Sequence, residues 1–493
     1  MDLEFVRPLI DWHAVAPEVV LTGVLLVVLT LDLVDGERFR PVMPTIAGIG
    51  LLATLVPLLT LALDGTTREL FGGAYVVDDF ALVLKALFVI VGYVVILLSV
   101  DYVRDGDYYE NEYYTLLLSS LLGMVIMGSS RDLITMFIAL ELLSIPAYML
   151  AAWRKGGWRS NEAGMKYYLM GVFATAVMLY GMSFVFGVGG STVFTDIAEA
   201  MSGPESSALI TVGILFTIIG FAFKVSAVPF HTWAPDTYEG APTPVTAFLS
   251  VGSKAAGFVA LLQLVFVAFV GREDVIEPLF WVLSAVTMTV GNLIALRQTN
   301  IVRLLAYSSV AQGGFMLAPF AVAGAPGQLA VESVVIYLII YAFMNLGAFA
   351  VVLAVARKTR SGDIASYGGL INYAPGMAGA MTVFLFALAG IPPLAGWFAK
   401  FAVFRAVIDA GTLAGYALGV VIAVNSVIAL VYYANVAKEM WFNPVPDGDE
   451  TPVPVTGSLG FAIGLTVLAT VVFGIVPGVI GHFGEISVLA SPL

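Results

Sequence analysis

Long apolar segments recur along the whole 493-residue chain and constrain its fold more than any other feature. A helix needs about 20 apolar residues to cross the hydrocarbon core of a bilayer. Runs of this kind, bounded by charges or by Pro and Gly clusters, predict an all-α polytopic membrane protein with about 14 transmembrane helices. The predicted spans are 17–34, 41–63, 79–100, 113–128, 131–151, 164–189, 208–230, 243–270, 278–296, 301–323, 330–356, 375–406, 411–438 and 457–480.

Basic residues are distributed unevenly between the two sets of loops. The loops after odd-numbered spans hold twelve of them, and the opposite set holds five. The positive-inside rule therefore predicts a plasma-membrane protein with the first set in the cytoplasm and both termini outside. The twelve are Arg38, Arg40, Arg104, Arg154, Lys155, Arg159, Arg297, Arg303, Arg357, Lys358, Arg360 and Lys438, and the five are Arg7, Arg68, Arg131, Arg272 and Arg405.

The chain contains no cysteine, which excludes disulfides, thiolate nucleophiles and iron–sulfur ligation in this chain. We expect no cofactor and no metal to be bound by it. The longest polar stretches, 190–207 and 439–456, have the length of loops, so no soluble domain is expected. The predicted surroundings are the lipid bilayer and other membrane proteins, and no nucleic acid.

Four ionisable residues lie deep inside predicted spans: Glu141, Lys224, Lys254 and Lys400. A charge at the bilayer centre costs about 2.5 to 3.5 kcal/mol on insertion scales, so such residues indicate a functional site. Lys166 lies near the start of its span, within reach of the interface. Lys85 is about 10 Å deep, at 1.5 Å per residue, and is expected to be partly interfacial.

Two of these lysines adjoin segments that proline disrupts. Lys224 precedes Pro229, and "GIPPLAGWFAKF" (390–401) places two prolines before Lys400. Proline removes a backbone donor and clashes with the preceding turn, so both helices are expected to be broken. Paired broken helices are typical of transporters built from two repeats. We therefore predict two inverted five-helix repeats, 113–270 and 271–438, between an N-terminal unit (1–112) and a C-terminal unit (439–493).

The buried charges allow two interpretations. Burial favours the neutral form of a lysine and a nearby carboxylate favours the charged form, so movement of Glu141 relative to Lys224 would transfer protons through Lys254 and Lys400. Alternatively, Glu141 and one lysine form a static ion pair between helices. Four polar residues are candidates for support in either case: His231, Ser250, Ser253 and Gln312.

Five motifs resemble one superfamily. "FKVSAVPFHTWAPDTYEGAPTPVTAFLSVGSKAAGF" (223–258) looks like the signature of the antiporter-like membrane subunits of respiratory complex I, shared with Mrp antiporters and membrane-bound hydrogenases. The match extends to "GSSRDLITMFIALELLSIPAYML" (128–150), "QTNIVRLLAYSSVAQGGFML" (298–317), "LAGIPPLAGWFAKF" (388–401) and "VYYANVAKEMW" (431–441). Within the superfamily the chain is most similar to subunit N of the NADH-quinone oxidoreductase type, where a lysine matches Lys400.

The resemblance implies a proton-translocating, non-redox subunit of a quinone oxidoreductase. It implies a relay of Glu141 paired with Lys224, then Lys254, then Lys400, with quinone, flavin and iron–sulfur clusters on partner subunits. Many relatives carry histidine where Gln312 stands, which suggests a water-mediated step. Two rival interpretations stay open: the D-type subunit of an Mrp Na⁺/H⁺ antiporter, and a structural subunit whose buried charges only pack helices.

Overall fold

The computed structural model describes residues 10–106, 110–201, 208–324, 327–446 and 448–489. Over these ranges the chain is a helical bundle with one two-stranded hairpin. The first half contains α1 (Ala16–Phe39), α2 (Met43–Asp64), β1 (Arg68–Leu70), β2 (Tyr75–Val77), α3 (Asp79–Arg104), α4 (Glu110–Ser129), α5 (Leu133–Ala151), α6 (Trp158–Gly189), α7 (Phe194–Met201), α8 (Ala208–Lys224), α9 (Trp233–Gly240), α10 (Thr243–Phe248), η1 (Leu249–Ser253), α11 (Lys254–Gln263) and η2 (Leu264–Ala268).

The second half is helical as well. It contains α12 (Glu273–Ala295), α13 (Ile301–Leu317), η3 (Ala318–Val322), α14 (Gly327–Thr359), η4 (Ile364–Tyr367), α15 (Leu370–Tyr373), α16 (Pro375–Ala389), α17 (Ala395–Asp409), α18 (Leu413–Phe442), α19 (Gly457–Ile475) and α20 (Gly478–Ile486).

Each of the predicted spans coincides with one helix or with one interrupted helix. Among the described residues, eleven helical segments are long and apolar enough to cross a membrane, and α8 and α16 are shorter apolar helices. The two shorter ones belong to the helices in which proline predicts a break: 225–232 separates α8 from α9, and 390–394 separates α16 from α17. The all-α membrane architecture with two broken helices is therefore confirmed.

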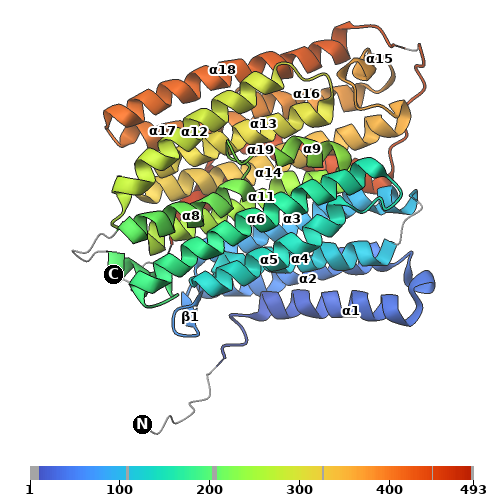
Figure 1. Ribbon diagram of the computed structural model, residues 1–493. Helices are drawn as coiled ribbons and strands as arrows, with labels where there is room; N and C mark the ends of the chain where they lie inside the picture. Colours follow the sequence, from blue (N-terminus) through green and yellow to red (C-terminus); the bar gives the residue numbers. More distant parts are fainter. Residues whose placement is uncertain (1–9, 107–109, 202–207, 325–326, 447, 490–493) are drawn as a thin grey trace.

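The centre of the bundle is formed by α14 and by the segment from α10 to η2, which are buried along almost their whole length. By contrast, α1 and α18 expose apolar faces to the surroundings. Figure 1 shows the long helices lying side by side, with β1 and the start of α1 at one end and α15 at the other. An apolar belt on the outside and a filled interior are what a lipid-facing bundle requires.

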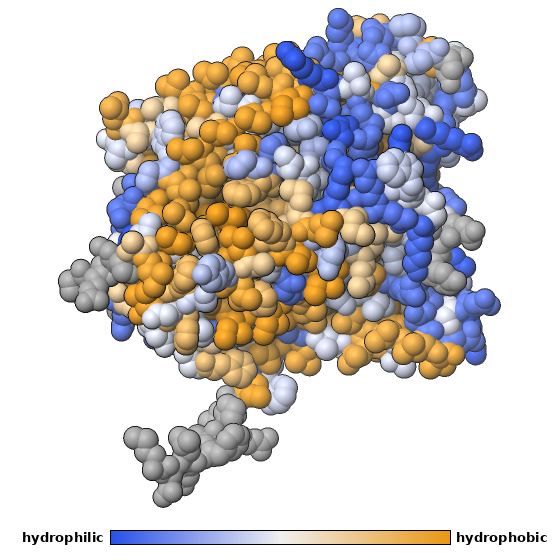
Figure 2. All heavy atoms as spheres, in the orientation of Figure 1, coloured by the Kyte–Doolittle hydropathy of each residue, from blue (hydrophilic) through white to orange (hydrophobic). Residues whose placement is uncertain are grey.

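The two ends of the bundle differ in polarity. We call the end with the α1 start and the α20 end the terminal end, and the opposite end, where the loops carry most of the arginines and lysines, the basic end. Figure 2 shows hydrophilic residues gathered at the basic end and hydrophobic residues over the rest of that face. Arg7 and the last four residues of the chain lie outside the described residues.

The two broken helices run in opposite directions. The chain passes from the terminal end through α8 to α9 at the basic end, whereas it passes from the basic end through α16 to α17 at the terminal end. An inverted pair of repeats produces this arrangement. The proposed boundaries 113–270 and 271–438 stay a prediction.

A feature that the sequence analysis missed is a buried ion pair at the terminal end. Arg131 donates a hydrogen bond of 2.8 Å to Asp78, and both side chains are 2% exposed. Asp78 also caps α3 by accepting from the backbone N–H of Ala81. The pair holds the start of α3 against the segment between α4 and α5, next to the hairpin.

We predict that Arg131→Met lowers the free energy of unfolding by about 3 to 5 kcal/mol, because it leaves the Asp78 carboxylate buried without its counter-charge. The double variant Arg131→Met/Asp78→Asn should recover much of this loss, since asparagine keeps the helix cap and carries no charge. Urea unfolding in detergent measures both. A double variant no more stable than the single one would contradict the electrostatic explanation.

Candidate functional site

Lys224 is the last residue of α8, at the first helix break. Its side chain is 3% exposed, and Nζ donates to Ser144 Oγ at 2.8 Å and to Tyr167 OH at 3.2 Å. The carbonyls of the last helical turn lack intrahelical partners and carry partial negative charge. The break therefore places the residue at the negative end of the α8 dipole, while its ammonium group bonds hydroxyls from α5 and α6.

Glu141 lies on α5, one turn before Ser144. It is partly exposed, on a face where Ile138 and Ile145 are also exposed, and its Oε1 is buried with no hydrogen-bond partner. Among the described residues no ion pair joins Glu141 to a lysine. The expected pair with Lys224 is thus not a direct contact, because the ammonium group bonds the Ser144 hydroxyl instead.

Lys254 begins α11, directly after η1, a π-helical turn of 5 residues. It is 2% exposed, and Nζ donates to both the carbonyl and the hydroxyl of Ser309, each at 2.6 Å. π-Helical turns occur frequently at functional sites because they re-aim the side chains that follow. No pattern in the sequence indicates this turn.

The Tyr167 hydroxyl lies between the segments that carry the first two lysines. Tyr167 accepts from Lys224, and its hydroxyl also faces Ser253, the residue before Lys254. The methylene stem of Lys224 packs over Gly257, where an added Cβ would lie 3.2 Å from Lys224 Cγ and 2.9 Å from Val225 Cγ1. The close approach of α8 and α11 therefore depends on glycine at 257.

Lys400 stands at the second helix break. It lies on α17 and is 8% exposed, and its Nζ reaches back across residues 390–394 to donate to the carbonyl of Ala389, the last residue of α16, at 2.8 Å. The same nitrogen lies 4.7 Å from the ring centroid of Phe315 on α13. Both break lysines thus occupy the C-terminal end of a half-helix.

Helix α13 connects Lys254 with Lys400. Gln312 donates from Nε2 to Leu388 O at 3.0 Å and to Tyr433 OH at 3.3 Å, and its Oε1 accepts from Tyr337 OH. Tyr433 OH also shares a hydrogen bond with Ser308, the neighbour of Ser309. Hydrogen bonds therefore join Lys254 to Ser309, and they join the neighbouring Ser308 through Tyr433 and Gln312 to Leu388, the residue before Ala389.

The predicted supporting residues differ in how close they lie to the lysines. Ser253 and Gln312 lie within the connections just described, and Ser250 is hydrogen-bonded to Ala247 O and accepts from Asn345. His231 lies in the break between α8 and α9, half-buried, with its ring 6.5 Å from that of Tyr307. It has no hydrogen bond to any of the four ionisable residues in the described part of the chain.

Sequence reasoning missed several residues that complete the connections, which are Ser144, Tyr167, Tyr337 and Tyr433. A signal was available for the tyrosines. A phenol hydroxyl inside an apolar helix needs a hydrogen-bond partner, so a buried tyrosine indicates polar neighbours. Which neighbours they are depends on helix packing, and the sequence does not contain that information.

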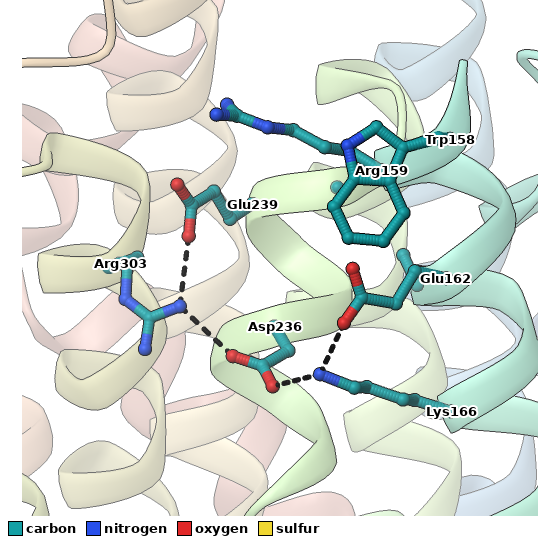
Figure 3. Close-up of a pocket in the computed structure, with 9 residues that line it drawn as sticks. Trp158, Arg159, Glu162, Lys166, Asp236, Glu239 and Arg303 are labelled. Atoms are coloured by element: carbon teal, nitrogen blue, oxygen red, sulfur yellow. Dashed lines mark hydrogen bonds and ion pairs between the residues drawn. The ribbon is translucent and has the colours of Figure 1, made fainter.

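A charged pocket opens at the basic end, beside the first broken helix. Its volume is about 240 Å³, and Figure 3 shows its acidic and basic side chains alternating. Lys166 bonds Glu162 and Asp236, each at 2.7 Å, while Arg303 bonds Asp236 at 3.0 Å and Glu239 at 2.8 Å. Lys166 is 42% exposed, as its expected interfacial position requires, and it precedes Tyr167 in the sequence.

The structure corrects the expected position of Lys85. Its depth in the span predicts a partly interfacial side chain, but it is fully buried, with Nζ 2.7 Å from Glu18 Oε1 and 2.9 Å from Tyr75 OH. The prediction is wrong because Glu18, in the first turn of α1, supplies a counter-charge from a neighbouring helix. A buried lysine with such a partner does not need to reach the interface.

Among the described residues, no group of three or more His, Asp or Glu side chains is arranged to hold a metal ion.

Comparisons with known proteins agree on the family. Residues 130–426 match the family model described as "NADH:quinone oxidoreductase/Mrp antiporter, TM". The chain is 38% identical to NADH-quinone oxidoreductase subunit N of Trichlorobacter lovleyi, with 97% of this chain and 96% of the relative covered. It is 41% identical to subunit N of Heliobacterium modesticaldum, with 90% of this chain and 91% of the relative covered.

Solved structures share the fold. A chain of respiratory complex I from Thermus thermophilus superimposes with a TM-score of 0.78 at 28% identity, covering 94% of this chain and 98% of that one. A chain of the Mrp complex from Dietzia sp. gives a TM-score of 0.84 at 19% identity, with 97% of both chains covered. At 19% identity the second likeness shows the fold alone.

We predict that Gly257→Ala destabilises the protein by about 1 to 3 kcal/mol, because the new methyl group would overlap Val225 and the stem of Lys224. Gly464→Ala on α19 is the matched control. Nothing lies within 4 Å of a Cβ at that position, and alanine is favoured over glycine in a helix by about 1 kcal/mol. Thermal unfolding in detergent should lower the Tm of the first variant and keep or raise that of the second.

Proposed function

The chain belongs to the NADH:quinone oxidoreductase/Mrp antiporter family of membrane subunits, and we propose that it is subunit N of a complex I-type quinone oxidoreductase. In this role it translocates protons across the membrane and carries out no redox step itself. Electron transfer to quinone in partner subunits supplies the energy. The quinone, the flavin and the iron–sulfur clusters belong to those partners.

The observation that carries the proposal is the line of polar contacts through an apolar bundle. Lys224 bonds Tyr167, Lys254 bonds Ser309, and Lys400 bonds the carbonyl of Ala389. Ser253 and Ser308, sequence neighbours of Lys254 and Ser309, add polar groups between these bonds. Every lysine in it is at least nine-tenths buried. A static ion pair between helices needs one acid and one base, whereas this line holds three lysines with no direct carboxylate partner among the described residues.

The chemistry follows from the poor solvation of charge in this interior. A buried ammonium group without a counter-ion readily loses its proton to an acceptor, and a carboxylate that approaches restores its affinity for the proton. Glu141 lies one turn of α5 from the Ser144 hydroxyl that Lys224 bonds. A shift of the ammonium group by one helical turn would bring it to the carboxylate, and its return would release a proton towards Lys254.

The positive-inside rule assigns the basic end to the cytoplasm and both termini to the outer side of the plasma membrane. The pocket beside the first broken helix then opens to the cytoplasm. Its charged side chains form a polar entrance, and Tyr167 follows Lys166 on α6 towards Lys224. In this proposal Lys400 lies on the outward half of the path, because α17 runs to the terminal end.

We predict that Lys254→Met lowers the number of protons translocated per electron at least twofold, because methionine keeps the volume of the side chain and holds no proton. Lys224→Met and Glu141→Gln should act in the same direction. The measurement is proton uptake by inside-out vesicles together with quinone reduction, after gel analysis has shown that the complex assembles. Lys155→Ala is the control, since that lysine is 68% exposed at the basic end, away from the relay.

Unchanged proton translocation in Lys254→Met and Lys224→Met complexes of normal abundance would overturn the relay. It would leave the packing role, in which the lysines only hold helices together. A loss of quinone reduction and proton uptake in equal proportion would also count against the relay, because a subunit outside the redox path should change the ratio of the two.

Copurification in mild detergent separates this proposal from an Mrp-type Na⁺/H⁺ antiporter. We expect companions that carry flavin and iron–sulfur chromophores, and proton uptake that does not depend on Na⁺. Companions without any chromophore, together with Na⁺-dependent proton movement, would instead indicate an antiporter of the Mrp type.

A further inference from the structure

A second cavity opens at the basic end, in the second half of the chain and apart from the pocket in Figure 3. Its volume is about 520 Å³, and the residues around it come from α12, α13, α18 and the segment that leads into η4. Its charged lining side chains are both carboxylates, Asp363 and Glu439. Gln298, Thr299 and Asn435 add neutral polar groups to the wall.

The inner wall of this cavity includes Tyr432, which is only 2% exposed. Its hydroxyl donates to Asn292 Oδ1 at 3.0 Å, and its ring packs on that of Tyr433 with the two ring centroids 4.3 Å apart. Tyr433 in turn bonds Ser308 and Gln312 on α13. Tyrosine hydroxyls therefore lead from an acidic cavity into the middle of the bundle.

The inner end of this hydroxyl chain lies at the centre of the line described above. Ser308 precedes Ser309, whose carbonyl and hydroxyl bond Lys254. Gln312 bonds Leu388 O, next to the Ala389 carbonyl that holds Lys400. The chain of hydroxyls thus meets the relay between Lys254 and Lys400. It does not include Lys224 or the pocket beside Lys224.

We propose that the cavity at Asp363 and Glu439, with Tyr432 and Tyr433, is a second proton inlet from the basic end, which supplies the relay between Lys254 and Lys400. The proposal rests on the proton-translocating function proposed above. Inward transfer requires the Tyr432 hydroxyl to turn from Asn292 Oδ1 to the hydroxyl of Tyr433. Tyr432 then passes its proton to Tyr433 as it accepts one from the cavity side, so charge and atoms balance along the chain. Lys254 and Lys400 are then loaded without a proton passing Lys224.

The hydroxyl chain ends at a group that controls passage. A carboxamide such as Gln312 donates and accepts hydrogen bonds but does not exchange protons as readily as a hydroxyl does. Its Nε2 and Oε1 are both engaged, with Leu388, Tyr433 and Tyr337. The inlet therefore does not short-circuit the membrane, because passage to Lys400 requires rearrangement of these bonds.

The first test removes single hydroxyls. Tyr432→Phe and Tyr433→Phe should each lower the number of protons translocated per electron at least twofold in the assembled complex, with quinone reduction retained. Tyr416→Phe is the matched control, because this tyrosine lies on the same helix but is 48% exposed, away from the cavity. Wild-type proton stoichiometry in both variants would overturn the inlet.

The second test blocks the cavity without changing the tyrosines, and it decides the matter if those variants do not assemble. The chain has no cysteine, so Ala365→Cys in the cavity wall introduces a single thiol. A bulky membrane-impermeant maleimide added to inside-out vesicles should lower the proton-to-electron ratio of this variant at least twofold. The ratios of Lys155→Cys and of the wild-type complex should not change.

The outcomes separate the two proposals. If Lys254→Met lowers proton translocation while the tyrosine variants and the blocked thiol do not, the inlet is wrong and the relay remains. If Lys254→Met has no effect either, the proton-translocating function fails, and the inlet fails with it.

Discussion

The absence of water from the hydrocarbon core is the constraint on which the rest of this structure depends. Every buried donor must find its acceptor inside the protein. Lys400 solves this problem with the second helix break, because the break ends α16 inside the bundle and leaves the Ala389 carbonyl free to accept from Nζ. Lys224 uses the hydroxyls of Ser144 and Tyr167. Lys254 uses the carbonyl and the hydroxyl of Ser309 instead. At the second break, the carbonyl at the end of α16 therefore supplies the acceptor that the buried lysine needs, and the lysine supplies the donor that this carbonyl needs.

This constraint also explains why the polar groups are arranged in lines. A lysine bonded to a hydroxyl leaves that hydroxyl in need of a further partner, and the next partner is again polar. The same logic applies at the terminal end, where Lys85 is balanced by Glu18 and Arg131 by Asp78. Those two cations have direct carboxylate partners and hold helices together. The three lysines of the proposed relay have none among the described residues, and this difference distinguishes them from the two cations that hold helices together.

Much of the fold was predictable because the bilayer limits the possible solutions. Apolar runs of about 20 residues predicted every span, and the prolines after Lys224 and before Lys400 predicted both breaks. The ionisable members of the site were predictable, since a charge in an apolar run stands out in a sequence, and Ser253 and Gln312 were among the predicted supporting residues. Tyr167, Tyr433 and Ser144 are ordinary residues in ordinary helices, and their role arises from packing between segments 57 to 125 positions apart. The buried state of Lys85 was missed for the same reason, because Glu18 belongs to another helix.

The position of Glu141 bears on how such a relay avoids becoming a static ion pair. Its carboxylate lies on a partly exposed face of α5, and one of its oxygens has no hydrogen-bond partner. Lys224 meanwhile bonds Ser144, one turn along the same helix. A direct pair of these two residues would stabilise the charged lysine so strongly that it would not release its proton. Separation by one turn keeps the attraction weak enough to be altered by a small movement, and a partner subunit that covers this face of α5 would be placed to cause it.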